Sequence, residues 1–292
     1  MPAFPLRKLA VFGVGLIGGS FARALKQAGA VQTVAGVGRS RANLERALQL
    51  GVIDEIAPDA QAAMADADLT LVAVPVAQTE QVLAEIAPHL PVDCVVSDAG
   101  STKQDVVAAA RRALGAKLSQ FVPAHPIAGA ELSGVEAASP TLFRERLVVL
   151  TPLDGTSAEA CTRVESAWRL CGARVMRMTP RRHDQVFAAV SHLPHALAFA
   201  LVEMIANRPD AQELFSFAGA GFRDFTRIAG SSPEMWRDIC LANREALLTE
   251  IAAYQAALAT LAEYIRSGQD AAIEGVFRQA RTARGEWMNG RK

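Results

Sequence analysis

The feature that most constrains this chain is a set of three spaced glycines between an apolar segment and an amphipathic one. Leu9–Val14 predicts a short buried strand, and Gly13-Val-Gly15-Leu-Ile-Gly18 closes it. The amphipathic stretch from there to Gly29 predicts a helix. GxGxxG alone is a weak signal, but a strand before it and a helix after it favour a dinucleotide-binding unit. Without a Cβ the backbone can approach a pyrophosphate, and the helix N-terminus offers N–H groups to that anion.

Strand-like and helix-like segments alternate through the first part of the chain. The expected strands are Thr33–Val37, Leu69–Val74, Cys94–Ser97, Gln120–Pro123, Leu147–Leu150 and Val175–Met178. The expected helices are Arg41–Leu50, Gln78–Ile86, Lys103–Leu114 and Ser157–Leu170. Continuous apolar strands that alternate with helices predict a parallel sheet covered on both faces. We therefore expect residues 1–179 to form an α/β Rossmann-type domain with a doubly wound parallel sheet.

After Thr179-Pro180 the strand signals end. Helical spacing relates Val186, Val190, Leu193, Leu197 and Leu201. Pro194 falls within this helix and is expected to kink it, and Ser232-Pro233-Glu234 predicts a helix start. A heptad-like seam, which needs another helix against it, is formed by Leu247, Ile251, Tyr254, Leu258, Leu261 and Ile265. We therefore expect residues 180–292 to form an all-α domain.

The composition narrows the range of partners. The 30 Lys+Arg residues balance the 30 Asp+Glu residues. A nucleic-acid-binding protein needs a surplus of basic residues on one face, so we expect no nucleic-acid partner. No segment offers about 18 uninterrupted apolar residues, so we expect no membrane span and a cytoplasmic location. The four cysteines form no CxxC pair. We expect buried, reduced thiols, with a Cys161–Cys171 disulfide as the alternative.

The end of the second strand bears on which dinucleotide binds. Enzymes that use NAD generally place an acid there to accept from the ribose 2′-hydroxyl. Here no acid occurs before Glu45, whereas Arg39 can pair with a 2′-phosphate and Ser40 can donate to it. We expect NADP, with NAD as the alternative, because an arginine can also stack on adenine. The expected cofactor contacts are Gly13, Gly15, Leu16, Ile17, Gly18, Arg39, Ser40, Val74 and Pro75.

His125 has the strongest positional argument among the five histidines. It follows the expected strand Gln120–Pro123, and ligands of doubly wound sheets bind at the carboxyl edge of the strands. Ser101 follows the strand that ends near Asp98, so it reaches the same edge. His125 and Ser101 are therefore expected to face the nicotinamide crevice, and His89, beside a Pro-bounded turn, is expected to have no role.

Two polar pairs occur in the second half of the chain. His192 and His195 could form a metal pair, but no acid or cysteine stands at ligand spacing, so we expect no metal. Asp224 and Arg227 are three residues apart and would share a helix face. An exposed ion pair of this kind contributes little to stability. The functional interpretation is an arginine held by an acid so that its guanidinium can bind a substrate carboxylate.

Five segments of the chain together point to one family. They are GVGLIGGS at 13–20, VSDAGSTK at 96–103, HPIAGAELSG at 125–134, SHLPH at 191–195 and GFRDFTRIAGSSPEMW at 221–236. With these segments in order, the chain resembles the prephenate/arogenate (cyclohexadienyl) dehydrogenases of tyrosine biosynthesis over essentially its whole length. Any one segment is a modest signal, whereas five in register across two domains are specific. The resemblance implies a homodimer built through the helical domains.

The resemblance also implies the reaction, an oxidative decarboxylation of a cyclohexadienol by NAD(P)⁺. His125 would accept a hydrogen bond from the ring C4 hydroxyl while C4 gives up hydride, and loss of CO₂ would then aromatise the ring. This role requires a neutral imidazole, which the ordinary histidine pKa allows at neutral pH. Ser101 is carried over as a partner of the same hydroxyl and of the nicotinamide.

The substrate-binding residues follow from the same resemblance. Arg227 is expected to bind a substrate carboxylate, His195 the side-chain end, and Glu131 with Asp224 the mouth of the site. Ala130 stands where some relatives place a hydroxyl residue beside that glutamate. Prephenate and arogenate therefore stay open as alternative substrates.

Two other functions stay open on the residues. The β-hydroxyacid dehydrogenases use a lysine in a long interdomain helix, whereas the lysines after residue 103 are Lys117 and Lys292. A non-enzymatic NADP-sensing module would not need His125 and Arg227 to converge on the nicotinamide.

L-Tyrosine is the expected regulatory ligand. It shares the substrate's ring, 4-oxygen and side-chain carboxylate, so it is expected to bind in the same pocket as a competitive inhibitor. The helical domain accounts for the chain from about residue 180 onwards, so no separate regulatory module is expected.

Overall fold

The computed structural model describes residues 4–129 and 134–290 of the chain. Backbone contacts divide it into two compact units, Met1–Arg244 and Glu245–Lys292. The strands of the first unit are β1 (Leu6–Phe12), β2 (Val31–Val37), β3 (Glu55–Ile56), β4 (Leu69–Val72), β5 (Val95–Asp98), β6 (Phe121–Val122), β7 (Ala124–Pro126), β8 (Leu147–Leu150) and β9 (Arg174–Arg177).

The helices of the first unit alternate with these strands and continue alone after β9. The α-helices are α1 (Leu16–Gln27), α2 (Arg41–Gln49), α3 (Ala60–Met64), α4 (Thr79–Ile86), α5 (Gln104–Leu114), α6 (Ala158–Leu170), α7 (Pro180–Phe187), α8 (Leu193–Ala206), α9 (Ala211–Ser216), α10 (Ala220–Thr226) and α11 (Pro233–Ala242). The shorter segments are the 3₁₀ turns η1 (Val76–Gln78), η2 (Ala87–His89), η3 (Gly115–Gln120) and η5 (Arg227–Gly230), and the π-helical turn η4 (Ala188–His192).

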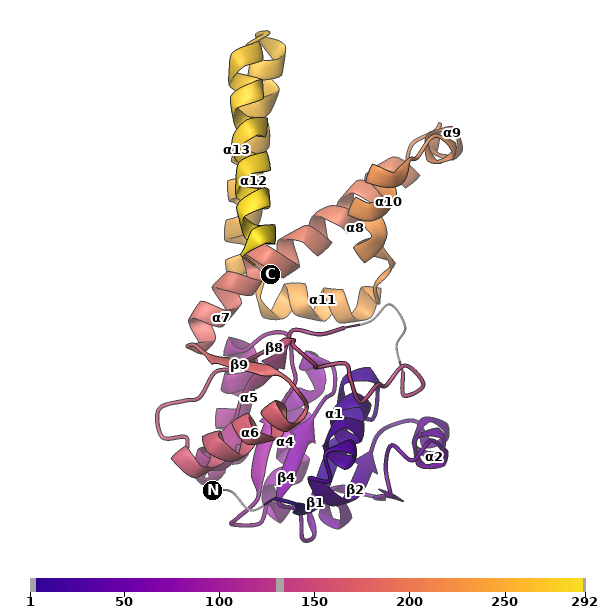
Figure 1. The fold of residues 1–292 in the computed structure, drawn as a ribbon, viewed down its shortest axis with the longest axis vertical. Helices are drawn as coiled ribbons and strands as arrows, with labels where there is room; N and C mark the ends of the chain where they lie inside the picture. Colours follow the sequence, from indigo (N-terminus) through magenta and orange to yellow (C-terminus); the bar gives the residue numbers. More distant parts are fainter. Residues whose placement is uncertain (1–3, 130–133, 291–292) are drawn as a thin grey trace. The chain divides into compact units, whose positions relative to one another are not determined.

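Strands β1 to β6 form one parallel sheet in the order β3-β2-β1-β4-β5-β6. Figure 1 shows β2, β1 and β4 of this sheet side by side. Successive residues of β1 face opposite cores. Leu9 and Val11 pack in the core under α1, α2 and α6, whereas Ala10 and Phe12 pack in the core under α3, α4 and α5. Helices therefore cover both faces of a parallel sheet whose strand order reverses beside β1, and the predicted doubly wound fold is confirmed.

The expected strands at 147–150 and 175–178 form, but they do not join this sheet. β8 and β9 instead make a smaller sheet with β7, in the order β7-β8-β9. β7 runs antiparallel to β8, with His125 opposite Val149, and β9 runs parallel to β8. Runs of three or four residues do not reveal their partner or direction, so the sequence does not predict β7. The small sheet holds His125 in a fixed register.

Hydroxyl side chains cap several of the predicted helices. Ser157 Oγ accepts from Ala160 N at 3.0 Å at the start of α6. Ser232 Oγ accepts from Met235 N at 3.3 Å, with Pro233 as the first residue of α11. The helix start predicted at Ser232-Pro233-Glu234 is therefore confirmed, and Ser157, the first residue of the other expected helix, caps α6.

The α-helix around Pro194 is not continuous. The π-helical turn η4 ends at His192 and α8 begins at Leu193, so Pro194 lies in the first turn of α8. A proline is tolerated there because its missing N–H would have no partner within that helix. A π-helical turn, a feature that is frequent at functional sites, therefore lies directly before Pro194.

Among the described residues, Pro180–Ala206 is the one helix that is long and apolar enough to cross a membrane by length and composition. It includes α7, η4 and α8. His183, Asp184 and His192 on this helix are buried. Each is hydrogen-bonded to a residue of the first unit outside the helix. His183 meets His125, Asp184 meets the Lys103 N–H, and His192 meets Asn243. These hydrogen bonds attach the helix to the rest of the first unit, although only 22% of its most apolar window is buried.

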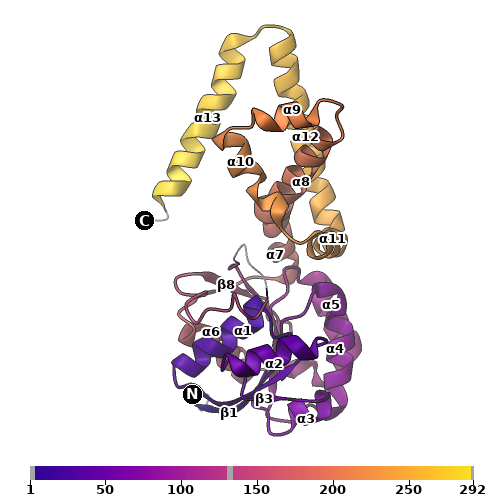
Figure 2. The same ribbon diagram turned by 90° about the vertical axis from the view of Figure 1, so that its right-hand side faces the viewer.

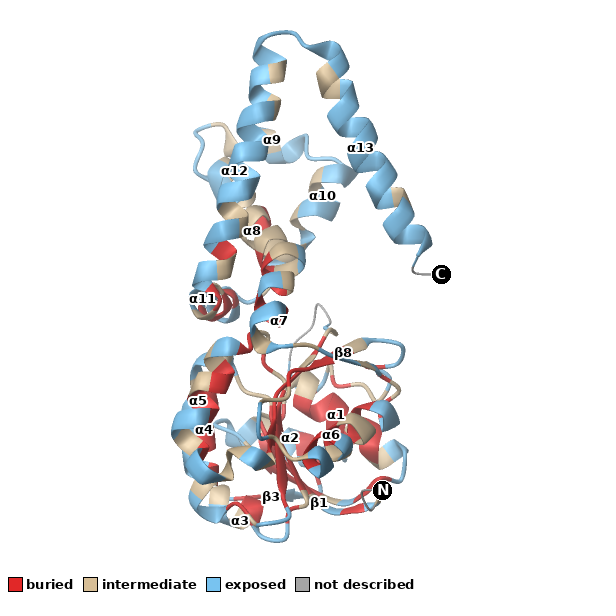
Figure 3. Ribbon diagram, turned by 90° about the vertical axis from the view of Figure 1, so that its left-hand side faces the viewer, coloured by how far each residue is buried: buried red, intermediate tan, exposed pale blue. Residues whose placement is uncertain are grey.

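The second unit holds α12 (Arg244–Arg266) and α13 (Asp270–Asn289), joined by a turn at Gly268. The two helices diverge from this turn (Figure 2), and most of their surface is exposed (Figure 3). Tyr254, Leu258 and Ile265 of the predicted seam are 36%, 48% and 61% exposed. Within the described part of this unit, the seam therefore lacks the helix that should cover it.

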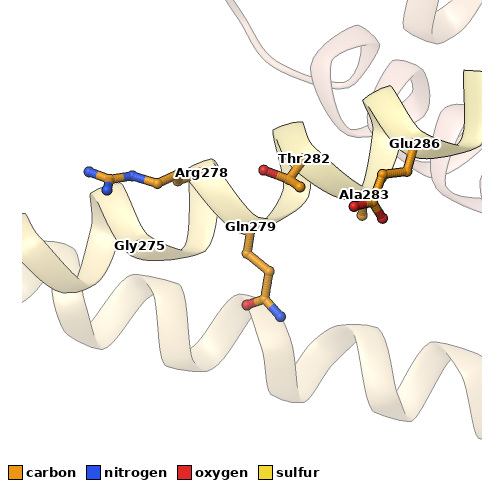
Figure 4. A pocket seen from close by; sticks show the side chains of 6 residues that line it. All are labelled: Gly275, Arg278, Gln279, Thr282, Ala283 and Glu286. Atoms are coloured by element: carbon orange, nitrogen blue, oxygen red, sulfur yellow. The ribbon is translucent and has the colours of Figure 1, made fainter. Parts of the chain in front are cut away.

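An open groove of about 460 Å³ lies along α13 (Figure 4). Its lining residues are Gly275, Arg278, Gln279, Thr282, Ala283 and Glu286. All of them come from one helix, so no opposing wall encloses a ligand. We assign no site to this groove.

Candidate active site

The glycine turn after β1 shows where a Cβ can and cannot be accommodated. A Cβ at Gly13, whose φ is 96°, would lie 2.4 Å from the Ala73 carbonyl oxygen. At Gly18 it would lie 2.2 Å from the Gly13 carbonyl oxygen. At Gly15 it would meet nothing within 4 Å. Packing therefore requires the first and third glycines, while the second borders open space, as a binding turn for a pyrophosphate needs.

The helix that follows this turn is arranged to receive an anion. The first backbone bond of α1 runs from the Gly19 N–H to the Gly15 carbonyl at 2.9 Å. The N–H groups of Leu16, Ile17 and Gly18 precede it and have no acceptor within the helix, as at any helix N-terminus. No acidic residue occupies the first turn of α1. These groups therefore fit the phosphates of a dinucleotide.

Val74 and Pro75 follow β4, the neighbour of β1 in the sheet. A Cβ at Gly13 would lie 3.1 Å from Val74 Cγ1, and Pro75 directly precedes η1. Because β1 and β4 are parallel, both residues lie at the same carboxyl edge as the glycine turn, where the sequence predicts cofactor contacts.

Arg39 and Ser40 follow the end of β2 and are exposed. Ser40 Oγ accepts from Asn43 N at 3.2 Å and so caps α2, which leaves its hydroxyl proton able to donate. Asn43 Nδ2 donates to the Val14 carbonyl at 2.8 Å. This bond ties the start of α2 to the glycine turn, so Arg39 and Ser40 flank the region where a dinucleotide-binding domain holds the adenosine ribose.

A buried ion pair organises the loop after β5. Lys103 Nζ lies 2.5 Å from Asp98 Oδ2, and both side chains are at most 1% exposed. The Asp98 carboxylate also accepts from Gly100 N at 2.7 Å and from Ala124 N at 3.0 Å. Such a pair is stable only when further hydrogen bonds satisfy it. Asp98 thus joins the loop that carries Ser101 to the strand that carries His125.

His125 lies on β7, directly after β6, which ends at Val122. Because β6 runs parallel to β1, His125 lies at the same carboxyl edge of the sheet as the glycine turn. Its Nδ1 lies 2.8 Å from His183 Nε2. Burial, followed by the charges of His183, Lys103 and His192, lowers the pKa of His125 well below its usual 6.5. The imidazole is therefore neutral at pH 7, the form that can accept a proton.

His183 and Asp184, at most 1% exposed, stand behind His125. His183 Nδ1 lies 2.8 Å from Asp184 Oδ1. The Asp184 carboxylate accepts from the backbone N–H groups of Lys103 and Gln104, each at 2.8 Å. Neither His183 nor Asp184 is among the site residues predicted from the sequence. The available signal is a pair of adjacent polar residues on the otherwise apolar face that leads to Val186 and Val190.

The helical part of the first unit brings His195 and Arg227 together. The His195 ring stacks on Trp236, with 3.7 Å between centroids and an 18° interplanar angle, and its Nδ1 lies 2.9 Å from the Ser191 carbonyl oxygen. Burial lowers the pKa of His195, the Ser191 carbonyl opposes this, and the charge of Arg227 adds to the lowering. Arg227 therefore lies within electrostatic range of His195. Trp236 closes the segment that ends at 236 but is absent from the predicted site.

One amide connects the two groups of side chains. Asn243 Nδ2 lies 2.9 Å from the Asp184 carbonyl oxygen and 3.0 Å from His192 Nδ1. His192 in turn meets Trp236 edge to face, and burial lowers the pKa of His192 to about 4. Contacts therefore run without a break from the sheet edge at His125 to the helical residues around His195.

Asp224 and Glu131 are the residues predicted at the mouth of the site. Asp224 lies on α10 and is exposed. Glu131, like Ala130, lies outside the described residues. Across the described ranges 4–129 and 134–290, no group of three or more His, Cys, Asp or Glu residues is placed to hold a metal ion. His192 and His195 are instead engaged with Asn243 and the Ser191 carbonyl.

Two family models match the chain in succession. The model of the prephenate dehydrogenase nucleotide-binding domain matches residues 21–177, and that of the prephenate dehydrogenase dimerization domain matches residues 179–279.

Individual relatives match over nearly the whole chain. Cyclohexadienyl dehydrogenase of Zymomonas mobilis is 35% identical over 280 residues, which cover 95% of each protein. Prephenate dehydrogenase of Bacillus subtilis is 37% identical over 274 residues, which cover 93% of this chain and 73% of the relative. The crystal structure of Aquifex aeolicus prephenate dehydrogenase with hydroxyphenyl propionate and NAD⁺ has a TM-score of 0.90 and 35% identity, covering 96% of this chain and 98% of that one.

The three glycines should respond differently to substitution. Gly15→Ala adds a Cβ that meets no protein atom, so we expect an unchanged Tm but binding of NAD(P)⁺ weakened about tenfold or more, equivalent to about 1.4 kcal/mol. Gly13→Ala forces a positive φ and a backbone clash, so we expect about 1–3 kcal/mol or more of destabilisation. Thermal melts and fluorescence titration with the cofactor measure the two effects. Undiminished cofactor binding by Gly15→Ala would contradict the assignment of the turn.

Proposed function

Since the chain belongs to the prephenate dehydrogenase family, we propose that it oxidatively decarboxylates prephenate or arogenate with a nicotinamide dinucleotide. The products are 4-hydroxyphenylpyruvate from prephenate and tyrosine from arogenate. The observation that carries the proposal is His125, a neutral imidazole fixed at the sheet edge that also bears the glycine turn. A cytoplasmic location accords with this biosynthetic role.

His125 handles the proton of the reaction in this mechanism. A dinucleotide held at the glycine turn would supply the hydride acceptor for ring C4. His125 takes the proton of the C4 hydroxyl as the carbonyl forms, and its low pKa keeps it ready to do so. Loss of CO₂ then sends the electrons of the broken C–C bond through the ring to the oxygen, and His125 returns the proton to form the phenol. Ser101, on the loop held by Asp98, partners the same hydroxyl.

The helical residues bind the ends of the substrate in this proposal. Arg227 pairs with a substrate carboxylate, and His195, stacked on Trp236, receives the side-chain end. Asp224 and Glu131 line the mouth. A charged hydrogen bond of the kind Arg227 would make contributes about 1.5–3 kcal/mol, which suits a residue that acts through binding.

We also propose a homodimer, with residues 1–179 binding the cofactor and residues 180–292 forming the helical part. The match of residues 179–279 to a dimerization domain supports it. So do the exposed apolar side chains of the second unit, among them Leu258, Ile265, Phe277 and Trp287. Patches of this kind on a folded protein mark interaction surfaces, and a second copy of α12 and α13 would supply the helix that the seam lacks.

The reaction is tested by adding prephenate or arogenate with NAD⁺ or NADP⁺ and following the absorbance of the reduced nicotinamide. His125→Asn should lower kcat about 10²–10⁴-fold, the usual contribution of a positioned base, with KM little changed. His89→Asn, on the exposed turn η2, is the matched histidine control and should leave the rate unaltered. Turnover by His125→Asn close to that of the unsubstituted protein would remove His125 as the base.

Arg39 and Ser40 support NADP⁺ as the preferred cofactor. Arg39→Asp would oppose the 2′-phosphate and accept from a 2′-hydroxyl, so it should weaken NADP⁺ while sparing or improving NAD⁺. Steady-state kcat/KM for both cofactors in both proteins measures the change. If the unsubstituted protein uses the two cofactors equally well, Arg39 does not discriminate between them.

L-Tyrosine is proposed to bind in the substrate pocket, with its hydroxyl on His125 and its carboxylate near Arg227 or His195. Inhibition should therefore be competitive with prephenate and free of sigmoidal dependence on tyrosine. Allosteric coupling would need a second site and two global states. Initial rates over a grid of prephenate and tyrosine concentrations distinguish the cases, and tyrosine binding that persists at saturating substrate would refute a shared pocket.

A further inference from the structure

The side chains behind His125 form a hydrogen-bonded series of two imidazoles and a carboxylate. His125 Nδ1 meets His183 Nε2, and His183 Nδ1 meets Asp184 Oδ1, each at 2.8 Å. We propose that His183 and Asp184 are positioning residues that hold His125 in the tautomer protonated on Nδ1 and leave the lone pair on Nε2 to accept the substrate's hydroxyl proton. The catalytic consequence rests on the proposed function.

Asp184 determines which atom donates and which accepts in each hydrogen bond of this series. Burial alone would raise the pKa of this carboxyl group, but hydrogen bonds from His183 and from the backbone of Gln104 and Lys103 bring it below its usual value. Asp184 is therefore ionised at neutral pH and can only accept hydrogen bonds. Both of its oxygens already face backbone N–H groups at the start of α5. The nitrogen of His183 that meets Asp184, Nδ1, must therefore carry a proton.

Because Nδ1 of His183 carries a proton, the protonation state of its other nitrogen, Nε2, can be deduced. Burial lowers the pKa of His183, the hydrogen bond to Asp184 opposes this, and the charges of Lys103, Asp184 and Asp98 add smaller effects of both signs. The net lowering keeps the ring neutral at pH 7. A neutral imidazole has one N–H, so Nε2 of His183 is an acceptor. The donor between the two rings is then Nδ1 of His125.

His125 itself faces three titratable or charged groups, which are His183, Lys103 and His192. Burial and the positive charge of Lys103 disfavour its protonation in the resting state, when His183 and His192 are neutral. With Nδ1 committed to His183, the lone pair of the neutral ring can lie only on Nε2. The bond made by one ring nitrogen thus decides the chemistry of the other, as in a Ser-His-Asp triad, where the carboxylate fixes the histidine tautomer.

The series can be broken at one atom without removing its neighbours. In His183→Asn the amide nitrogen lies where Nδ1 lay and can still donate to Asp184, but the side chain is too short to reach His125. In His183→Gln the amide oxygen can reach the place of Nε2 and accept from His125 Nδ1. The first variant removes the acceptor for His125, and the second restores it.

The tautomer is measured directly by NMR of the imidazole nitrogens in the full-length protein, without substrate. Comparison with His125→Asn and His183→Asn assigns the two signals. In the unsubstituted protein we expect a neutral His125 with its proton on Nδ1. In His183→Asn we expect a mixture of the Nδ1-protonated and Nε2-protonated tautomers. A His125 protonated on Nε2 in the unsubstituted protein, or an unchanged signal in His183→Asn, would overturn the proposal.

Kinetics with prephenate separate positioning from a merely structural role. His183→Asn should lower kcat roughly 10²-fold, within the contribution of a positioned base, with little change in KM. His183→Gln should recover most of the loss, and His89→Asn should lose nothing. A structural role predicts instead that both variants at 183 fail alike, and that result would overturn the proposal. If the unsubstituted protein oxidises neither prephenate nor arogenate, the proposed function fails, while the tautomer is still decided by NMR.

Discussion

Two buried carboxylates hold the same short segment of chain, and the site depends on this arrangement. Asp98 binds the Lys103 ammonium and the Gly100 N–H, whereas Asp184 accepts from the backbone N–H groups of Lys103 and Gln104. Asp98 belongs to the parallel sheet and Asp184 to the first helix after β9, so residues 100–104 are fixed from both sides. Removing one partner of such a buried set leaves a charge without compensation, at a cost of about 3–5 kcal/mol. The loop with Ser101 is therefore a rigid joint between sheet and helix.

Local patterns predict the parts of the fold that depend on local physics. The glycine turn, the helix start at Ser232 and every strand of the parallel sheet except the two-residue β3 follow from steric constraints, buried apolar runs and capping, each of which acts within a few residues. The small sheet does not, because pairing between β7 and β8 joins segments about 25 residues apart and each contributes only a few residues. The π turn before Pro194 is equally hidden, since helical spacing is the same on either side of it. His125 is placed by its strand, whereas His183 is recognised only once α7 lies against that strand.

The apolar seam of α12 shows the opposite situation, because within the described residues of the second unit no helix covers most of it. Leu247 is buried, yet Leu258 and Ile265 on the same seam are largely exposed. Burial of such side chains contributes about 25 cal/mol of stabilisation per Å² of apolar surface. The diverging helices of the second unit leave this surface exposed, so the stabilisation is not gained. In the proposed homodimer, a second copy of the chain would bury these side chains.

The environment of His125 solves a problem that burial creates. A buried imidazole is reliably neutral, but a very low pKa also makes it a weak base. Burial and the positive charge of Lys103 disfavour the imidazolium equally at rest and during reaction. In the proposed mechanism the His183–Asp184 series stabilises protonated His125 more than the resting neutral ring. The reason is that the negative charge of Asp184 attracts the positive charge that appears on His125 only when the proton arrives. Interactions that strengthen only as charge develops lower the barrier, whereas those already present in the resting state do not. The carboxylate is best placed two rings away, near enough to stabilise the imidazolium and far enough to leave the resting histidine neutral.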